Sequence, residues 1–182
     1  MPDLYVLRHG QTDWNAEGRL QGATDIPLNA LGRSQARRNG EALAAHLPDP
    51  SALRYAASPL RRASETLAIA REAMGLERED FHRDERLMEA RFGAWEGRLM
   101  RDIKAEEPDL WEAARLDRWN VTPPGAEGTA ESFKTLAARV EAFLAETIHT
   151  ASDDMLVATH GGTMRVIRVL FGESAPEIVG TL

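Results

Sequence analysis

Two short apolar runs, each followed by a histidine and a glycine, constrain this chain more than any other feature. The runs and the residues after them are 4–7 with Arg8, His9 and Gly10, and 155–159 with His160, Gly161 and Gly162. Continuous apolar runs of this length are typical of strands buried on both faces of a parallel sheet. Ligands bind beyond the carboxyl ends of such strands, so neighbouring strands would bring both imidazoles into one crevice. The pattern therefore predicts a ligand site on an α/β fold.

Helical periodicity fills much of the chain between these runs. We expect a third strand at 53–57 and helices at 30–47 after an Asn29 N-cap, at 59–74 after a Ser58 N-cap, at 133–148, and from about Gly162 onward. Strands that alternate with helices indicate a mostly parallel sheet with helices on both faces. The predicted fold is a three-layer α/β/α domain with a mostly parallel central sheet.

Residues 1–182 contain no dividing linker and no internal repeat, so we expect one catalytic domain. The segment 92–127 differs from the rest, because its periodicity is weak and it carries three tryptophans, Trp95, Trp111 and Trp119. We expect this excursion to lie over the sheet edge and to act as a lid. Trp14, Trp95 and Trp119 could line a substrate cleft, although aromatic side chains more often pack in a core.

Composition excludes several classes of protein. The chain is 43% hydrophobic, has a formal net charge of −7 and contains no cysteine. Disorder, membrane spans, disulfides and cysteine-based zinc sites are therefore not expected, and neither is affinity for nucleic acid or an anionic membrane. Because the N-terminus shows no secretory signal, a cytoplasmic protein is expected.

Two arginines stand at an unusual place, in the first turn of the helix expected from residue 59. A helix N-terminus carries partial positive charge, so Arg61 and Arg62 are locally unfavourable there. A phosphate held by Arg8, Arg62 and free helix N–H groups would reverse that effect. The alternative is that both arginines of the helix point into solvent.

Four ordered segments resemble the signatures of the histidine phosphatase superfamily, which includes cofactor-dependent phosphoglycerate mutase, fructose-2,6-bisphosphatase and α-ribazole phosphatase. The segments are Leu7-Arg8-His9-Gly10-Gln11-Thr12 with Asn15 and Gln21-Gly22, then Ser58-Pro59-Leu60-Arg61-Arg62-Ala63, then Leu87-Met88-Glu89, and Thr159-His160-Gly161-Gly162. The glycine of the family's Gly-Glu-Ser is replaced here by Ala130. The common phosphate-binding and nucleophile motifs, including G-x-x-x-x-G-K-[ST] and G-x-S-x-G, are missing.

The resemblance implies a phosphoglycerate mutase-like fold and a role for each of these side chains. His9 would be the nucleophile that becomes phosphohistidine, and Glu89 would be the general acid. Arg8, Arg62 and a protonated His160 would surround the transferring phosphoryl group, with no metal and no cofactor. The residues expected to bind the substrate are Arg8, Asn15, Gln21, Gly22, Arg62, His160 and Gly161. By contrast, His46, His82 and His149 are expected to be solvated or at helix ends, and Glu96 to pair with an arginine.

The predicted function is hydrolysis of a phosphomonoester, either a small metabolite or a phosphoprotein. The alternatives are a 2,3-bisphosphoglycerate-dependent phosphoglycerate mutase and a regulatory module on a phosphatase fold. Family mutases are longer, and family members generally continue into a further strand after the helix that follows the second histidine, whereas this chain stops at Leu182. The length favours hydrolysis over transfer, and one sheet edge is expected to be exposed or covered by a second copy in a homodimer.

Overall fold

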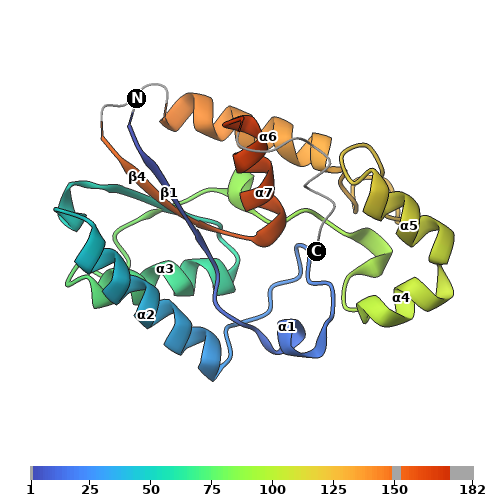
Figure 1. Ribbon diagram of the computed structural model, residues 1–182, viewed down its shortest axis with the longest axis horizontal. Coiled ribbons are helices and arrows are strands. Elements are labelled where there is room, and N and C mark those ends of the chain that lie inside the picture. Colours follow the sequence, from blue (N-terminus) through green and yellow to red (C-terminus); the bar gives the residue numbers. More distant parts are fainter. Residues whose placement is uncertain (1, 149–152, 173–182) are drawn as a thin grey trace.

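A computed structural model describes residues 2–148 and 153–172 and has a four-stranded parallel sheet between two layers of helices (Figure 1). The strands are β1 (Leu4–Arg8), β2 (Arg54–Ala57), β3 (His82–Arg83) and β4 (Met155–Thr159). Their order in the sheet is β1-β4-β2-β3. The predicted α/β class is confirmed, and the two strands that precede the histidines are direct neighbours.

Four of the seven described helices cover the two faces of the sheet. They are α1 (Asp13–Glu17), α2 (Ala30–His46), α3 (Arg61–Ala73), α4 (Met100–Glu106), α5 (Pro108–Leu116), α6 (Phe133–Thr147) and α7 (Gly161–Leu170). Short 3-10 turns lie at Pro50–Ala52, Glu85–Leu87 and Gly93–Trp95. Helices α2 and α3 cover one face, and α6 and α7 cover the other (Figure 1). The predicted three-layer arrangement is therefore confirmed.

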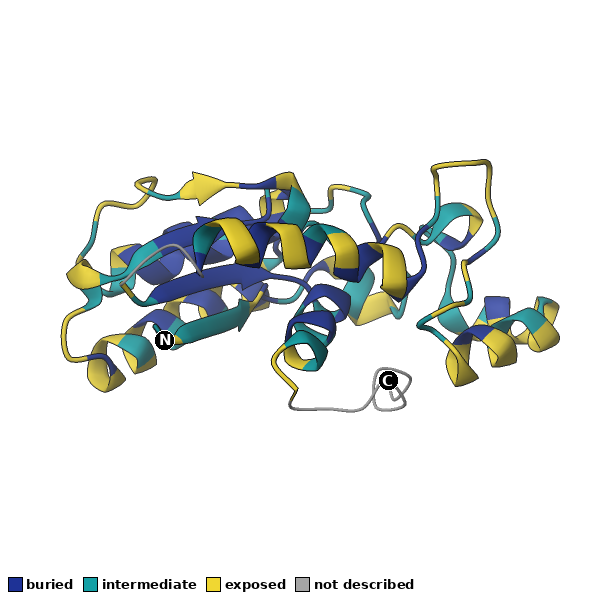
Figure 2. Ribbon diagram, turned by 90° about the horizontal axis from the view of Figure 1, so that it is seen from above, coloured by how far each residue is buried: buried dark blue, intermediate teal, exposed yellow. Residues whose placement is uncertain are grey.

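The side chains of β4 point alternately to the two faces of the sheet, so this strand contributes to the hydrophobic core on each face. Leu156 and Ala158 belong to the core beneath α2 and α3, whereas Met155 and Val157 belong to the core beneath α6 and α7. All five residues of β4 are buried, and the central strands are correspondingly dark in Figure 2. A continuous apolar run is what a strand covered on both faces requires.

The start of α3 differs from the prediction. Ser58 and Pro59 lie between β2 and the helix, Leu60 is the N-cap residue, and the helix begins at Arg61. The cap comes from elsewhere in the chain, because Asp25 Oδ1 accepts a 2.7 Å hydrogen bond from the Arg61 N–H. Local sequence favoured Ser58 as the cap, but this remote carboxylate takes that role. The Asn29 cap of α2 is as predicted, accepting from the Gly32 N–H at 2.9 Å.

The segment 92–127 extends to one end of the molecule and carries α4 and α5 away from the sheet (Figures 1 and 2). It has a small core of its own, in which Trp95 is 3% exposed and packs with Ile103 and Ala114. The Trp95 and Trp111 rings lie 5.9 Å apart, and Trp95 Nε1 donates to Glu107 Oε2 at 3.0 Å. These tryptophans thus pack in a core, whereas the lid function remains a prediction.

β1 pairs with β4 alone among the described strands, so the other edge of β1 is unpaired within that part of the chain. The homodimer expected to cover an edge stays a prediction, and residues 173–182 lie outside the described residues. None of the described helices is both long and apolar enough to cross a membrane.

Candidate active site

Three strand ends converge at the candidate site. His9 follows β1, His160 follows β4, and Ser58 follows β2. The His9 and His160 rings lie 5.1 Å apart between centroids, with their planes inclined at 59°. The sheet order therefore brings together the two histidines that the sequence placed at separate strand ends.

One ring nitrogen of His9 is fixed by the backbone. Its Nδ1 lies 2.7 Å from the Gly10 carbonyl oxygen, which can only accept, so Nδ1 carries the proton and Nε2 keeps its lone pair. The ring is 8% exposed. Burial, together with the positive charge of Arg62, lowers the pKa of His9 to about 3. The imidazole is therefore neutral at pH 7.

His160 is fully buried behind His9, and its Nε2 lies 2.8 Å from Ser58 Oγ. Burial and the nearby charge of Arg62 lower the pKa of His160 well below its ordinary value. This environment favours the neutral ring, and the protonated His160 expected from the resemblance stays a prediction. Sequence reasoning assigned Ser58 to a helix cap and missed its contact with this ring.

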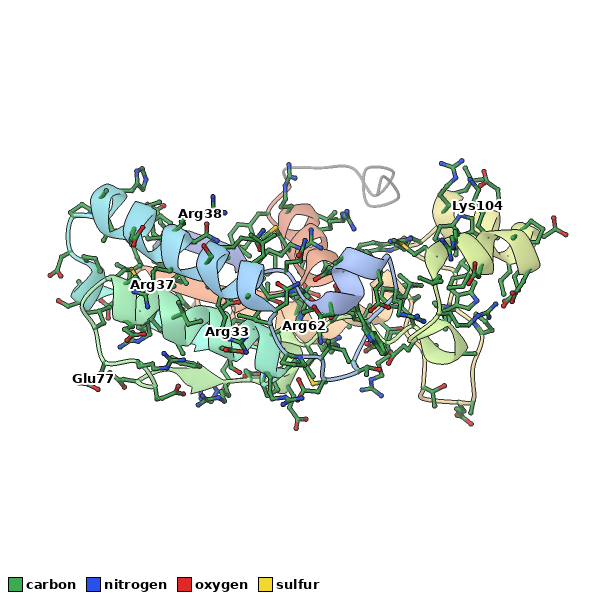
Figure 3. The ribbon with its side chains drawn as sticks, turned by 90° about the horizontal axis from the view of Figure 1, so that it is seen from below. Arg33, Arg37, Arg38, Arg62, Glu77 and Lys104 are labelled. Carbon is green, nitrogen blue, oxygen red and sulfur yellow. The ribbon has the colours of Figure 1, made fainter. Side chains whose placement is uncertain are left out.

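Arg61 and Arg62 both contact the loop of residues 22–25 but differ in burial. Arg61 is exposed and binds Asp25, with Nε 2.9 Å from Oδ2. Arg62 is fully buried and donates to the carbonyl oxygens of Gly22 and Thr24, at 2.7 Å each. Figure 3 shows Arg62 near the middle of the molecule, in contrast to Arg33 and Arg37 along the outer helix. Arg62 is therefore the arginine of this pair that reaches the site.

The Glu89 carboxylate lies at the N-terminus of α7, the helix that begins directly after His160. Its carboxylate accepts hydrogen bonds from the backbone N–H of Gly162 at 3.0 Å and of Thr163 at 3.2 Å. A Cβ at position 162 would stand 2.5 Å from Glu89 Oε1, so this close approach requires glycine. The helix thus fixes the carboxylate beside the two histidines.

The ion pair of Arg139 and Glu131 holds the loop that carries Glu89. Arg139 Nη2 lies 3.0 Å from Glu131 Oε2, and Glu131 is 8% exposed. Arg139 also donates to the carbonyl oxygens of Arg86, Met88 and Glu89, at 2.7, 2.9 and 3.0 Å. One guanidinium therefore fixes three backbone groups around Glu89.

Amide side chains from the first loop lie on the other side of the histidines. Thr12 Oγ1 lies 2.9 Å from Gln21 Oε1 and 3.0 Å from Asn15 Oδ1. Because both amide oxygens are engaged there, the NH₂ groups of Asn15 and Gln21 remain as donors. Gly22 has a φ of +55°, and a Cβ on it would stand 2.0 Å from Glu96 Oε1, so a side chain there is excluded.

These groups surround a cavity of about 130 Å³. Its lining includes eight of the nine predicted site residues: Arg8, His9, Asn15, Gln21, Gly22, Arg62, Glu89 and Gly161. His160, the ninth, lies behind His9 and does not line the cavity. Sequence reasoning missed the remaining lining residues, which are Arg19, Leu20, Phe92, Met100, Arg118, Phe133, Gly162 and Arg165. Arg165 could have been found, because it follows Gly161 by about one helical turn.

Glu96 differs from its prediction, because it forms no ion pair with an arginine among the described residues. It accepts instead from the Ala23 N–H at 3.0 Å and from Thr24 Oγ1 at 2.7 Å, which ties the Arg62-binding loop to the segment 92–127.

His46 and His82 are exposed, as expected, and His149 lies outside the described residues. In residues 2–148 and 153–172, no three His, Asp or Glu side chains gather as a metal ion would require, and metal independence remains a prediction.

The chain is similar to known proteins over nearly its whole length. The profile of the histidine phosphatase superfamily (branch 1) matches residues 4–178. The 2,3-bisphosphoglycerate-dependent phosphoglycerate mutase 2 of Gloeobacter violaceus is 32% identical over 97% of this chain and 78% of that protein. Phosphoglycerate mutase-like protein 4 of Arabidopsis thaliana is 31% identical over 96% of this chain and 72% of that protein. Mycobacterial glucosyl-3-phosphoglycerate phosphatase, solved with inorganic phosphate, superposes with a TM-score of 0.80 at 31% identity, covering 100% of this chain and 84% of that one.

Proposed function

Because the chain belongs to the histidine phosphatase superfamily, we propose that it hydrolyses small phosphomonoesters through a phosphohistidine formed on His9. The observation that carries the proposal is the setting of His9, whose Nδ1 is engaged by the Gly10 carbonyl at 2.7 Å while Arg62 lines the same cavity. A neutral imidazole with one nitrogen fixed presents the other to phosphorus. Buried guanidinium groups stabilise the charge on the transferring oxygens.

In the first step, His9 Nε2 attacks phosphorus and a nitrogen–phosphorus bond forms. The bond from phosphorus to the ester oxygen breaks, and that oxygen takes a proton from the Glu89 carboxyl group, so the alcohol leaves uncharged. Glu89 is placed for this role because it lines the cavity with His9 and is held by the first N–H groups of α7. Arg8 and Arg62 hold the phosphoryl oxygens during transfer.

In the second step, water attacks the phosphorus of phosphohistidine and gives its proton to the Glu89 carboxylate. The nitrogen–phosphorus bond breaks, its electron pair returns to His9 Nε2, and inorganic phosphate leaves. Both catalytic groups are then restored. His160, neutral and bound to Ser58, acts as a fixed neighbour that supports the His9 ring.

The size of the cavity favours a small metabolite over a phosphorylated protein side chain. Its volume of about 130 Å³ is well below the 300–1,000 Å³ of sites for drug-sized ligands. It also favours hydrolysis over mutase activity, because a mutase must hold a bisphosphate and present each of its phosphates to the same histidine. The mutase remains the second candidate, since curated relatives with that name are about one-third identical.

The test is phosphate release by the purified protein from a panel of small phosphomonoesters, beside the His9→Ala variant. We expect release by the wild type and none by the variant. A second assay supplies 3-phosphoglycerate with catalytic 2,3-bisphosphoglycerate, and little 2-phosphoglycerate should form. Formation of 2-phosphoglycerate at a rate comparable with phosphate release would place the mutase first.

A further inference from the structure

The residue that follows His9 packs against helix α2 at very short range. A Cβ at position 10 would stand 2.3 Å from the Gly32 carbonyl oxygen, so only glycine fits there. Glycine has more backbone freedom than any other residue, and the carbonyl oxygen of Gly10 is the group that binds His9 Nδ1. The partner of the nucleophile therefore belongs to the most flexible type of residue, and its direction has to be fixed by other contacts.

Gln35 of α2 fixes the peptide group between Gly10 and Gln11. The Gly10 carbonyl and the Gln11 N–H belong to one planar trans peptide and point in opposite directions. The N–H donates to Gln35 Oε1 at 2.8 Å, and the carbonyl oxygen lies 2.7 Å from His9 Nδ1. A rotation of this peptide that moved the carbonyl away from His9 would also break the bond to Gln35. The amide oxygen of Gln35 therefore holds the carbonyl toward the imidazole.

Thr66 of α3, the helix beside α2 (Figure 1), fixes the peptide group before Gly10. Its side chain is fully buried, and Thr66 Oγ1 accepts a hydrogen bond from the Gly10 N–H at 3.0 Å. The same hydroxyl donates to the Arg62 carbonyl oxygen at 2.6 Å, one turn back on α3. Because that bond uses the hydroxyl proton, the oxygen faces Gly10 as an acceptor. Thr66 thus joins the backbone beside the nucleophile to the backbone of Arg62.

The direction of the Gly10 carbonyl decides which nitrogen of His9 can react. A neutral imidazole carries one proton, and the nitrogen without the proton is the nucleophile. While the Gly10 carbonyl accepts from Nδ1, the lone pair is on Nε2. If the carbonyl turned away, the proton would be free to move to Nε2, and that nitrogen would lose the lone pair that attacks phosphorus. The reactivity of His9 therefore depends on the contacts that orient the Gly10 backbone.

We propose that Gln35 and Thr66 are positioning residues for the nucleophile. Each accepts one of the two backbone N–H groups beside the Gly10 α-carbon, and together they keep the carbonyl toward His9 Nδ1 and the lone pair on Nε2. The proposal rests on the proposed function, because it concerns how His9 is prepared for attack. Neither side chain is among the described residues that line the cavity, so both act through the backbone and not through the substrate.

The position of the His9 proton tests these roles directly. In protein labelled with ¹⁵N at histidine, protonated and unprotonated ring nitrogens have well separated chemical shifts, and His9→Asn identifies the signals of this ring. We expect the wild type to carry the proton on Nδ1. Gln35→Met and Thr66→Val remove the acceptor oxygen at nearly constant size. Each should give a mixture in which part of the protein carries the His9 proton on Nε2.

The rate of the first step should change with the proton position. In single-turnover mode it should fall by about 10- to 100-fold in both variants, as when a group that orients a metal-bound histidine is lost. The factor should be the same for an alkyl phosphate and for p-nitrophenyl phosphate, because both need the same nucleophile. Inorganic phosphate should still inhibit Gln35→Met within about threefold of the wild type, since the arginines at the cavity are unchanged. Gln35→Glu and Thr66→Ser keep an acceptor oxygen and should restore the Nδ1 proton and most of the rate.

Two control variants match these changes without touching the Gly10 backbone. Thr147→Val removes a hydroxyl that makes the same kind of bond one turn back on α6, from Oγ1 to the Phe143 carbonyl oxygen at 2.7 Å. Arg38→Met changes an exposed residue of α2, three positions after Gln35. Both controls should keep the His9 proton on Nδ1 and the rate of the wild type.

Three results would overturn the proposal. One is a wild type with the His9 proton on Nε2, and another is a proton that stays on Nδ1 in the Met and Val variants, whatever their rate. The third is a shifted proton with an unchanged first step. Gln35 is only partly buried, so Gln35→Met decides the matter even if Thr66→Val does not fold. Failure of the proposed function is distinct, because the wild type would then release phosphate from no ester, whereas the proton position is measured without turnover.

Discussion

The strand ends and the segment 92–127 meet at one cavity but are built by different means. His9 and His160 follow strands of the parallel sheet, and their positions are fixed by the register of β1 with β4. The segment 92–127 packs around Trp95 in a small core of its own, and α4 and α5 extend away from the sheet (Figure 1). One region holds the reacting groups, and the other contributes Phe92, Met100 and Arg118 to the cavity.

This contrast suggests a division of roles between chemistry and selection. A sheet register tolerates little change, because a slip of one residue turns every side chain to the other face. A peripheral segment with its own core can change its surface without disturbing the sheet. We therefore expect substitutions at the strand ends to abolish turnover, and substitutions in 92–127 to alter stability locally or change substrate preference.

The largest effect is expected from Glu89→Gln with an alkyl phosphate. The alcohol is a poor leaving group, so loss of the positioned acid should slow its cleavage by about 10²- to 10⁴-fold. With p-nitrophenyl phosphate the first step should change far less, because p-nitrophenolate leaves without a proton. The burst of p-nitrophenol in single-turnover mode isolates that step from dephosphorylation. An equal loss with both substrates would make Glu89 a structural residue.

Trp95→Ala should loosen the segment 92–127 more than the sheet. Removing a buried tryptophan costs about 3–5 kcal/mol, and the cavity would open among Ile103, Ala114 and Trp111. Hydrogen exchange should accelerate in α4 and α5 while β4 stays protected. Trp95→Phe is the control, since it keeps an aromatic ring. Equal acceleration in β4 and α5 would show that the two regions unfold as one unit, which would contradict the independent packing of the segment 92–127.

The buried histidines should make the protein less stable as the pH falls. The pKa of His9 is lowered from 6.5 to about 3 and that of His160 is lowered well below 6.5, so the unfolded chain binds protons that the native state does not. Stability is therefore lost as pH falls below about 6.5, by about 1.4 kcal/mol per pH unit for each histidine.

Denaturant unfolding between pH 5 and 6.5 measures this slope in a range where few carboxylates titrate. His9→Asn should reduce the slope, and the exposed control Arg38→Met, which removes no group that titrates in this range, should leave it unchanged. A slope that is the same in wild type and His9→Asn would mean that His9 titrates normally in the folded protein.

The smallest effect is expected at Arg139, which holds the loop that carries Glu89. Arg139→Lys keeps the ion pair with Glu131 but cannot bind three carbonyl oxygens at once, so kcat for an alkyl phosphate should fall about tenfold with KM little changed. The first step with p-nitrophenyl phosphate should be nearly unaffected, and the exposed control Arg38→Met should behave as wild type. A matched loss with both substrates would indicate general misfolding.

The parts of this molecule that the sequence predicts are those set by local pattern. The buried runs at 4–7 and 155–159 identify β1 and β4, and alternation with helices implies that both lie in one parallel sheet. The resemblance supplied Glu89, which no periodicity indicates. Its position at the start of α7 depends on tertiary contacts with Gly162 and Thr163.

The errors arose where a partner distant in the chain replaced a local one. Asp25 caps α3 in place of Ser58, and Ser58 is left to bind His160. The charge of His160 depends on its burial near Arg62, which a linear sequence does not reveal. Arg118 lies after α5 in a segment without clear periodicity, so its place in the cavity follows from how that segment packs.

The central claim is that His9 carries the phosphoryl group, and chemical trapping tests it most directly. The wild type is mixed briefly with ³²P-labelled substrate and quenched, and the label on the protein is then tested for acid lability and alkali stability and located by peptide mapping. The account predicts label on His9 that is acid-labile and alkali-stable, and none in His9→Ala. Label that persists in His9→Ala, or that maps to another residue, would contradict it.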